Sequence, residues 1–216
     1  MGMRIARGFD LAEAHAHLRR GDARLARWMR RIGPLQLDFS ARFQTVDALA
    51  RSILHQQLSG KAAATITARV AALMPRARIT EAGLAALPDA ALRAAGVSAN
   101  KLAALRDLAL RAQRGALPSV RQLEHMDDAA IVAALTPVRG IGRWTVEMLL
   151  MFRLGRPDVL PLDDLGVRMG AGLVDALATP PPPRALAERG ACWAPYRSLA
   201  GFYLWRVVEH ARSVSA

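Results

Sequence analysis

The chain has 216 residues, of which 52% are hydrophobic, enough for one large core or two smaller lobes. Its formal charge of +12 favours a polyanionic partner, with nucleic acid ahead of an anionic membrane. The single cysteine, Cys192, excludes an intramolecular disulfide and a four-cysteine iron–sulfur cluster. No apolar run reaches membrane-spanning length and no secretory signal is recognisable, so we expect a soluble, intracellular protein.

Nearly all of the positive charge comes from arginine, because Lys61 and Lys101 are the only lysines. Arginine suits the planar recognition of phosphate. An arginine-rich composition also follows from a GC-rich gene, so charge alone does not decide the function.

Helical signals dominate the chain, with apolar residues at helical spacing between capping residues and glycine or proline terminators. Thr45 is the expected N-cap of the third helix, and the proline run at 180–183 cannot lie inside a helix. The best strand candidate is the segment 35–45. The predicted helices cover residues 10–20, 22–32, 46–57, 60–74, 80–86, 89–95, 100–114, 119–126, 127–135, 143–154, 165–178 and 197–212.

These elements predict an all-α fold with two lobes and a cleft between them. Residues 45–150 are expected to form a central helical lobe. Residues 1–44 and 151–216 are expected to combine into a second helical lobe, built from the N- and C-terminal segments.

A glycine turn at residues 136–148, TPVRGIGRWTVEM, is the first segment that indicates a function. Gly140 and Gly142 flank Ile141, which can anchor the turn in the core, while the glycines leave backbone amides uncovered. A helix that starts near Arg143 directs its amides and its positive dipole end toward an anion. The segment therefore suits a sequence-independent grip on a DNA phosphate, although an ordinary corner between two helices explains it as well.

A carboxylate pair follows at residues 156–170, RPDVLPLDDLGVRMG. Asp163 and Asp164 precede a helical stretch, and a helix N-terminus favours the ionised form of a carboxyl group. An ionised carboxylate can stabilise the positive charge that develops on a sugar when an N-glycosidic bond breaks. The simpler alternative is that both residues only cap the helix.

In this order, the two segments resemble the helix-hairpin-helix DNA glycosylases that carry a Gly/Pro-rich loop and an invariant aspartate, the HhH-GPD superfamily. Within it the chain looks most like the alkylbase branch, the 3-methyladenine II type. Two further segments agree: residues 51–64, RSILHQQLSGKAAA, are similar to the family's loop that enters the DNA stack, and residues 96–101, GVSANK, match its G-[IV]-S-x-x-K segment. The resemblance implies a two-lobed helical glycosylase fold with a DNA-binding cleft between the lobes.

The resemblance also implies a role for individual residues. Asp164 is the expected catalytic carboxylate, with Asp163 as a capping or supporting residue. Gln57, with Leu58 beside it, is the expected wedge that fills the space of a flipped base; the alternative for Leu58 is burial at a helix–helix connection. The expected DNA-backbone contacts are Gly140, Ile141, Gly142, Arg143 and Thr145, and the carbonyls of Thr136, Arg139 and Ile141 are candidates to hold a monovalent cation.

The residue at position 144 indicates the type of reaction. Relatives that also cut the DNA strand carry a lysine there as the nucleophile for a Schiff base, and this chain has Trp144. The resemblance therefore implies a monofunctional enzyme that uses water, needs no cofactor and leaves the DNA strand intact.

Aromatic residues are expected to form the base pocket, because an alkylated purine is cationic and is attracted to an aromatic face. Trp144 and Trp193 match pocket positions of the alkylbase branch. Met148 lies one helical turn from Trp144, where a third aromatic residue is expected, and this indicates a wider pocket. Trp28 and Trp205 are assigned to the core.

The most concrete hypothesis is an enzyme that flips out and hydrolyses alkylated bases, of the 3-methyladenine and 7-methylguanine type, in base excision repair. Its partner would be double-stranded DNA with alkylated bases, bound by a monomer in the cytoplasm at the nucleoid. One alternative is a mismatch or oxidised-base glycosylase of the same superfamily; another is a non-catalytic helix-hairpin-helix protein that binds DNA structure. A basic protein that binds RNA or a membrane surface ranks last.

Overall fold

The structure, a computed structural model, describes residues 7–214 of the chain, and the regular secondary structure of these residues is helical. They contain thirteen α-helices and two short 3-10 helices, with no β-strand. The all-α prediction is therefore confirmed, and the strand expected at 35–45 is wrong. This segment is extended but has no partner strand; instead, Leu35 and Leu37 pack on a helical core, and the Leu35 N–H donates to the Tyr203 hydroxyl at 3.3 Å.

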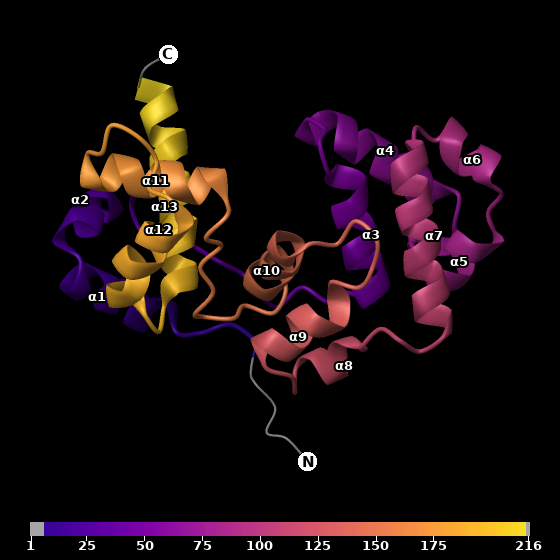
Figure 1. Ribbon diagram of the computed structural model, residues 1–216, viewed down its shortest axis with the longest axis horizontal. Helices are drawn as coiled ribbons and strands as arrows, with labels where there is room; N and C mark the ends of the chain where they lie inside the picture. The colour runs from indigo at the N-terminus through magenta and orange to yellow at the C-terminus, as the bar shows by residue number, and fades with distance from the viewer. Residues whose placement is uncertain (1–6, 215–216) are drawn as a thin grey trace. The chain divides into compact units, whose positions relative to one another are not determined.

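The described chain divides into two compact units (Figure 1). The first unit contains residues 42–146, and the second combines residues 7–41 with residues 147–214. The second boundary falls inside helix α10 (Arg143–Phe152), whereas the sequence places it at residue 150.

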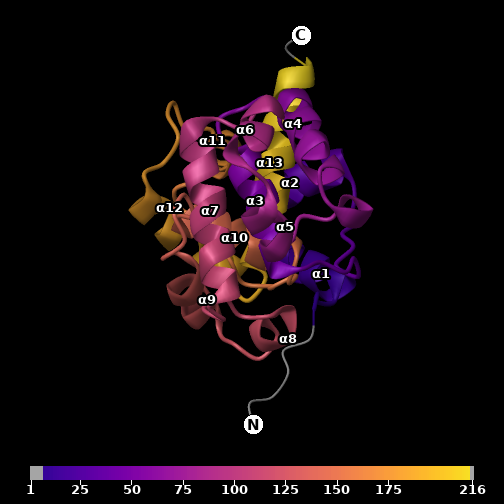
Figure 2. The ribbon, with the colours of Figure 1, turned by 90° about the vertical axis from the view of Figure 1, so that its right-hand side faces the viewer.

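Helix α7 is the centre of the first unit, where it packs against α3, α5 and α6 (Figure 2). Leu49, Leu105 and Leu108 are among the fully buried residues of this unit. The N-cap of α3 is Gln44 rather than Thr45, whose hydroxyl donates to the Pro118 carbonyl at 2.8 Å. Besides the start of α10, the unit contains α3 (Thr45–His55), α4 (Gly60–Ala72), η1 (Pro75–Ala77), α5 (Glu81–Ala86), α6 (Asp89–Ala94), α7 (Ala99–Gln113), α8 (Val120–Leu123) and α9 (Asp128–Leu135).

The centre of the second unit is the contact between α11 and α13, and α2 packs against both of these helices (Figure 1). A Cβ atom at Gly170 of α11 would collide with the backbone of Leu204 in α13, so this close helix approach requires glycine. The sequence did not predict α12, which begins with Pro183 at its first turn, where proline is tolerated. Besides the rest of α10, the unit contains α1 (Leu11–Gly21), α2 (Ala23–Ile32), α11 (Leu165–Asp175), α12 (Pro183–Arg189), η2 (Gly190–Trp193) and α13 (Arg197–Val214).

Two kinds of feature are absent from residues 7–214. No helix there is both long and apolar enough to span a membrane. No group of three or more His, Cys, Asp or Glu residues in the same part of the chain could hold a metal ion.

Candidate nucleic-acid interface and catalytic carboxylate

The glycine turn forms a tight hairpin between α9, which ends at Leu135, and α10. The Val138 N–H donates to the Leu135 carbonyl at 3.1 Å, and the Ile141 N–H donates to the Val138 carbonyl at 3.0 Å. Gly140 has a φ of 79°, a conformation that L-residues rarely adopt. The Ile141 side chain is buried, as expected for the residue that anchors the turn.

Two side chains from neighbouring segments fix the conformation of this hairpin. Asp107 of α7 accepts the Arg139 N–H at 2.8 Å, and Gln56 Nε2 donates to the Gly140 carbonyl at 2.7 Å. Burial alone would raise the pKa of Asp107, but hydrogen bonds from the Arg139 N–H and the Arg111 side chain outweigh it and lower the pKa. An ionised carboxylate therefore holds the turn. Sequence reasoning missed both residues, because neither lies in the hairpin motif.

The predicted phosphate contacts differ in how their side chains are placed. Gly140, Gly142 and Arg143 are exposed, whereas the side chains of Ile141 and Thr145 are buried. The last two residues could therefore reach a phosphate only through their backbone amides. The arrangement fits an anion at the N-terminus of α10, where the helix dipole favours negative charge.

The predicted cation ligands lie in the same turn. The carbonyls of Leu135, Val138 and Gly140 accept hydrogen bonds within the unit. The carbonyls proposed for a monovalent cation, those of Thr136, Arg139 and Ile141, alternate with them along the turn. Carbonyl oxygens are suitable ligands for such an ion, and the site stays a prediction.

The predicted wedge loop connects α3, which ends at His55, to α4, which begins at Gly60. Gln57 has a φ of 55°, in the left-handed region, and Leu58 is 41% exposed. Leu58 is therefore not buried at a helix connection. Lys101 Nζ donates to the Leu54 carbonyl at 2.7 Å and holds the end of α3.

Asp164 is the N-cap of helix α11, and two side-chain hydrogen bonds reach one of its carboxylate oxygens. Its Oδ1 atom accepts the Val167 N–H at 2.8 Å and the Trp205 indole N–H at 2.9 Å. These two N–H donors hold the carboxylate oxygen in a fixed position at the start of the helix. Asp163 is exposed and does not cap the helix, so the capping role expected for it belongs to Asp164.

Trp205 reaches Asp164 because α11 and α13 approach closely. A Cβ atom at Gly166 would lie 2.9 Å from the Trp205 ring and 3.1 Å from Asp164 Oδ1, so glycine leaves the space for this contact. The Trp205 ring also stacks on Phe152, with ring centroids 5.7 Å apart. As the sequence predicts, Trp205 packs against the core of the second unit. The ring is only half-buried, however, and it also lies beside the candidate catalytic group, which the sequence did not predict.

Helix α10 carries the other residues predicted for the base pocket. Trp144 is 45% exposed and Met148 is half-buried. Phe152, which the sequence analysis did not select, is 49% exposed and follows at the same spacing of four residues. Residues spaced by four lie on one face of a helix, so α10 presents two aromatic rings and one thioether in a row.

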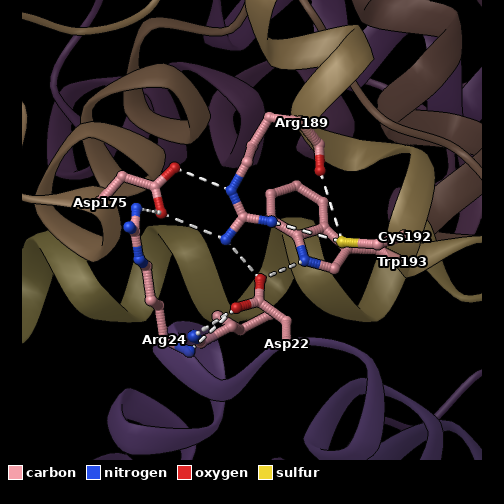
Figure 3. Close-up of polar contacts among 7 residues, drawn as sticks. Asp22, Arg24, Asp175, Arg189, Cys192 and Trp193 are labelled. Carbon is pink, nitrogen blue, oxygen red and sulfur yellow. Dashed lines mark hydrogen bonds and ion pairs between the residues drawn. The ribbon is translucent and has the colours of Figure 1, made fainter.

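Trp193 lies in the core of the second unit, which conflicts with its predicted place in a base pocket. The ring is fully buried, and its N–H donates to Asp22 Oδ2 at 2.7 Å (Figure 3). The Arg189 guanidinium carbon lies 4.9 Å from the ring centroid. A ring enclosed in this way leaves no face for a nucleobase.

An ionic network surrounds Trp193 and connects three parts of the second unit (Figure 3). Arg189 binds Asp22, at the start of α2, and Asp175, at the end of α11, over 2.5 and 2.8 Å. Burial would raise the pKa of Asp22, but hydrogen bonds from Leu25, Trp193 and Arg189 lower it. Burial alone would lower the pKa of Arg189, but its hydrogen bonds to Asp175 and Asp22 raise it. Asp22 and Arg189 are therefore both charged at neutral pH.

A groove of about 950 Å³ lies in the first unit, away from the residues described above. Thr45, Arg78 and Ser119 are among its lining residues, and no residue of the predicted site lines it. The groove adjoins the N-terminal end of α3, whereas the wedge loop follows its C-terminal end, about 15 Å away at 1.5 Å per residue. The residues predicted to form the base pocket therefore do not line this groove.

Comparison with known proteins gives a consistent result. Residues 50–195 match the profile described as HhH-GPD superfamily base excision DNA repair protein. The chain is 32% identical over 204 residues to DNA-3-methyladenine glycosylase 1 of Schizosaccharomyces pombe, a match that covers 94% of this chain and 90% of the relative.

Two solved structures share the fold. One is the S. pombe 3-methyladenine DNA glycosylase (Mag1) in complex with abasic DNA, with a TM-score of 0.82 and 32% identity over 90% of this chain and 95% of that chain. The other is the DNA-3-methyladenine glycosidase of Bacillus halodurans, with a TM-score of 0.81 and 34% identity over 94% of this chain and 92% of that chain. The chain therefore belongs to the HhH-GPD superfamily of base excision DNA repair proteins, in the branch of the 3-methyladenine DNA glycosylases.

Proposed function

We propose that this protein is a monofunctional DNA glycosylase that flips alkylated bases, such as 3-methyladenine and 7-methylguanine, out of duplex DNA and releases them by hydrolysis. The observation that carries the proposal is the Asp164 carboxylate, held by Trp205 and the N-terminus of α11. The branch to which the chain belongs acts on the same class of lesion, according to the name of its S. pombe relative.

Asp164 would act on the sugar. Departure of the base leaves positive charge on the deoxyribose, and an ionised carboxylate stabilises that charge or orients the attacking water. A positively charged alkylpurine is already a good leaving group, so the enzyme needs little acid catalysis. The two donors at Oδ1 fix the direction of the carboxylate, which limits the reorganisation needed in the transition state.

Aromatic side chains would bind the base. We assign this role to Trp205 and to Phe152, whose ring stacks on it, and we propose Trp144 and Met148 of α10 as further residues that contact the base. An electron-rich ring attracts a cationic purine more strongly than a neutral one. Trp193 is not part of the proposed pocket, because it is buried.

The hairpin and the wedge loop would hold the DNA. The amides and dipole at the start of α10 suit one backbone phosphate, a contact independent of sequence. Gln57, at the strained tip of its loop, would fill the gap that the flipped nucleotide leaves, with Leu58 beside it. The protein is expected to act as a monomer on double-stranded DNA.

Position 144 supports the absence of strand cleavage, because Trp144 cannot form a Schiff base and neither Lys61 nor Lys101 belongs to the hairpin.

Incubation with methylated genomic DNA tests the proposal. We expect mass spectrometry to detect released 3-methyladenine or 7-methylguanine and borohydride to trap no protein–DNA adduct. Release of oxidised or mismatched bases alone would favour a different member of the superfamily. A trapped adduct would contradict the monofunctional mechanism.

A further inference from the structure

Helix α2 of the second unit carries an unusual concentration of arginine. Residues 19–31 contain six arginines and a single carboxylate, that of Asp22. Four of the arginines are exposed along one side of α2, and we call this surface the arginine face: Arg24, Arg27, Arg30 and Arg31. The opposite side of the helix, with Leu25 and Met29, is buried in the core of the unit.

Most of this charge has no counter-charge in the part of the chain that the structure describes. Arg24 pairs with Asp175 at 3.3 Å. Asp22 is buried and bound to Arg189. Among residues 7–214, no ion pair involves Arg27, Arg30 or Arg31.

The fold itself explains only part of this arrangement. Cations in the last turn of a helix are favoured by the helix dipole, which accounts for Arg30 and Arg31. Arg27 lies in the middle of the helix, three and four residues before them, and like charges at these spacings repel. Because the arginines of this surface repel one another, binding of an external polyanion would stabilise it.

The geometry favours the phosphate backbone of DNA over a membrane. A membrane-bound helix needs an exposed apolar face, and here the apolar face is buried. Trp28 is covered in part by His210 and Arg31, at 6.0 and 5.2 Å from its ring. From Arg24 to Arg31 the helix rises by about 10 Å. Over about 10 Å of the DNA axis, one strand carries about three phosphates, since it has one phosphate per roughly 3.4 Å of axis.

We propose that the arginine face is a second DNA-binding surface, which contacts backbone phosphates separately from the α9–α10 hairpin. The identity of the partner as DNA rests on the proposed function, whereas the surface does not depend on the glycosylase chemistry. Guanidinium groups form bidentate hydrogen bonds to phosphate, and such contacts add affinity without reading sequence.

The test measures how salt affects binding of the full chain to an undamaged 30-base-pair duplex. In the triple variant R27Q/R30Q/R31Q, the slope of log K against log salt should become shallower by about 2 to 3, close to 0.9 for each lost phosphate contact. The variant R27K/R30K/R31K keeps the charge and should retain most of the slope. An unchanged slope in the glutamine variant would overturn the proposal.

The matched control removes three exposed arginines of the first unit, as R76Q/R114Q/R121Q. It loses the same net charge and should keep the wild-type slope. If the slope becomes equally shallow in this control, net charge alone explains the effect. That result would contradict the proposal of a local DNA-binding surface.

A measurement on the unmodified protein does not depend on how the variants fold. DNA should protect Arg27 and Arg30 from a dicarbonyl reagent specific for arginine, with peptide mass spectrometry as the readout. Equal modification with and without DNA would contradict the proposal and leave an acidic protein as the candidate partner. If the wild type releases no alkylated base but the slope still depends on this face, the proposed glycosylase function falls and the second DNA-binding surface stands.

Discussion

The indole N–H of Trp205 donates a hydrogen bond to Oδ1 of Asp164, with 2.9 Å between the two atoms. The two residues are 41 positions apart and meet because α13 packs against the start of α11. The same oxygen accepts the Val167 N–H, so one atom of the carboxylate is tied to the helix end and to an aromatic ring. Trp205 is therefore placed to orient the carboxylate, and in the proposed function its ring also contacts the base.

Replacement of Trp205 with phenylalanine should slow base release without unfolding the protein. The variant keeps an aromatic ring but loses the donor to Asp164, and a hydrogen bond to a charged group contributes about 1.5–3 kcal/mol. We expect single-turnover release from alkylated DNA to fall by at least about tenfold, with little change in DNA affinity. Trp28→Phe is the matched control, and equal rates in the two variants would remove the positioning role of Trp205.

Gly166→Ala tests the space beside the carboxylate. The added methyl group would lie 2.9 Å from the Trp205 ring and 3.1 Å from Asp164 Oδ1, so it must displace one of them. Base release should therefore fall. Gly172→Ala in the same helix is the control, since its methyl group would meet Pro180 at an ordinary 3.5 Å. If both variants retain wild-type rates, the packing around Asp164 is not important for activity.

Gln57→Gly separates strain from function in the wedge loop. Glycine adopts the positive φ of this position without strain, so the melting temperature should not fall. Because the glycine has no side chain to fill the gap in the DNA stack, release of alkylated bases from duplex DNA should slow, as should release by Gln57→Ala. Duplex activity equal to wild type in both variants would transfer the wedge role to Leu58.

The network around Arg189 predicts a pH-dependent stability for the second unit. The pKa of Asp22 is lowered in the folded protein from its ordinary value of 3.8. Its contribution to the free energy of unfolding is therefore complete above that value and is lost as the pH falls through the lower, folded pKa. Thermal unfolding measured between pH 7 and pH 2 should show this loss.

Asp22→Asn should lower the free energy of unfolding at pH 7 by about 3 kcal/mol, because it leaves Arg189 short of a buried partner. The difference from wild type should shrink once the wild-type carboxylate is protonated. Glu188→Gln is the control, because it breaks the ion pair with Arg184 at the surface. The side chains of Arg184 and Glu188 are 92% and 69% exposed, so this substitution should change the free energy of unfolding little. A constant difference across the whole pH range would exclude Asp22 as the titrating group.

Local patterns in the sequence predicted most helices and the hairpin. Capping residues and periodic apolar positions act over a few residues, so Ser59, Ser98 and Asp127 cap helices close to where the pattern places them. The glycine turn was predictable for the same reason, because positive φ at Gly140 is a local requirement.

The features that the sequence did not predict depend on contacts between distant segments. Asp22, 171 positions away, accepts a hydrogen bond from the Trp193 indole N–H, and no local signal marks that pair. No local pattern marks Trp205 either, because its contact with Asp164 forms only when α13 packs against α11. The segment 35–45 has alternating apolar residues but no partner strand, so it packs on helices instead.

The measurement that tests the account most directly is base release by Asp164→Asn on methylated duplex DNA. Asparagine is also a good N-cap and can accept the hydrogen bonds from Val167 and Trp205, so the substitution removes the charge and keeps the fold. We predict a release rate lower by at least about 100-fold, with unchanged affinity for undamaged duplex. A rate within a few-fold of wild type would contradict the assignment of Asp164 as the catalytic carboxylate.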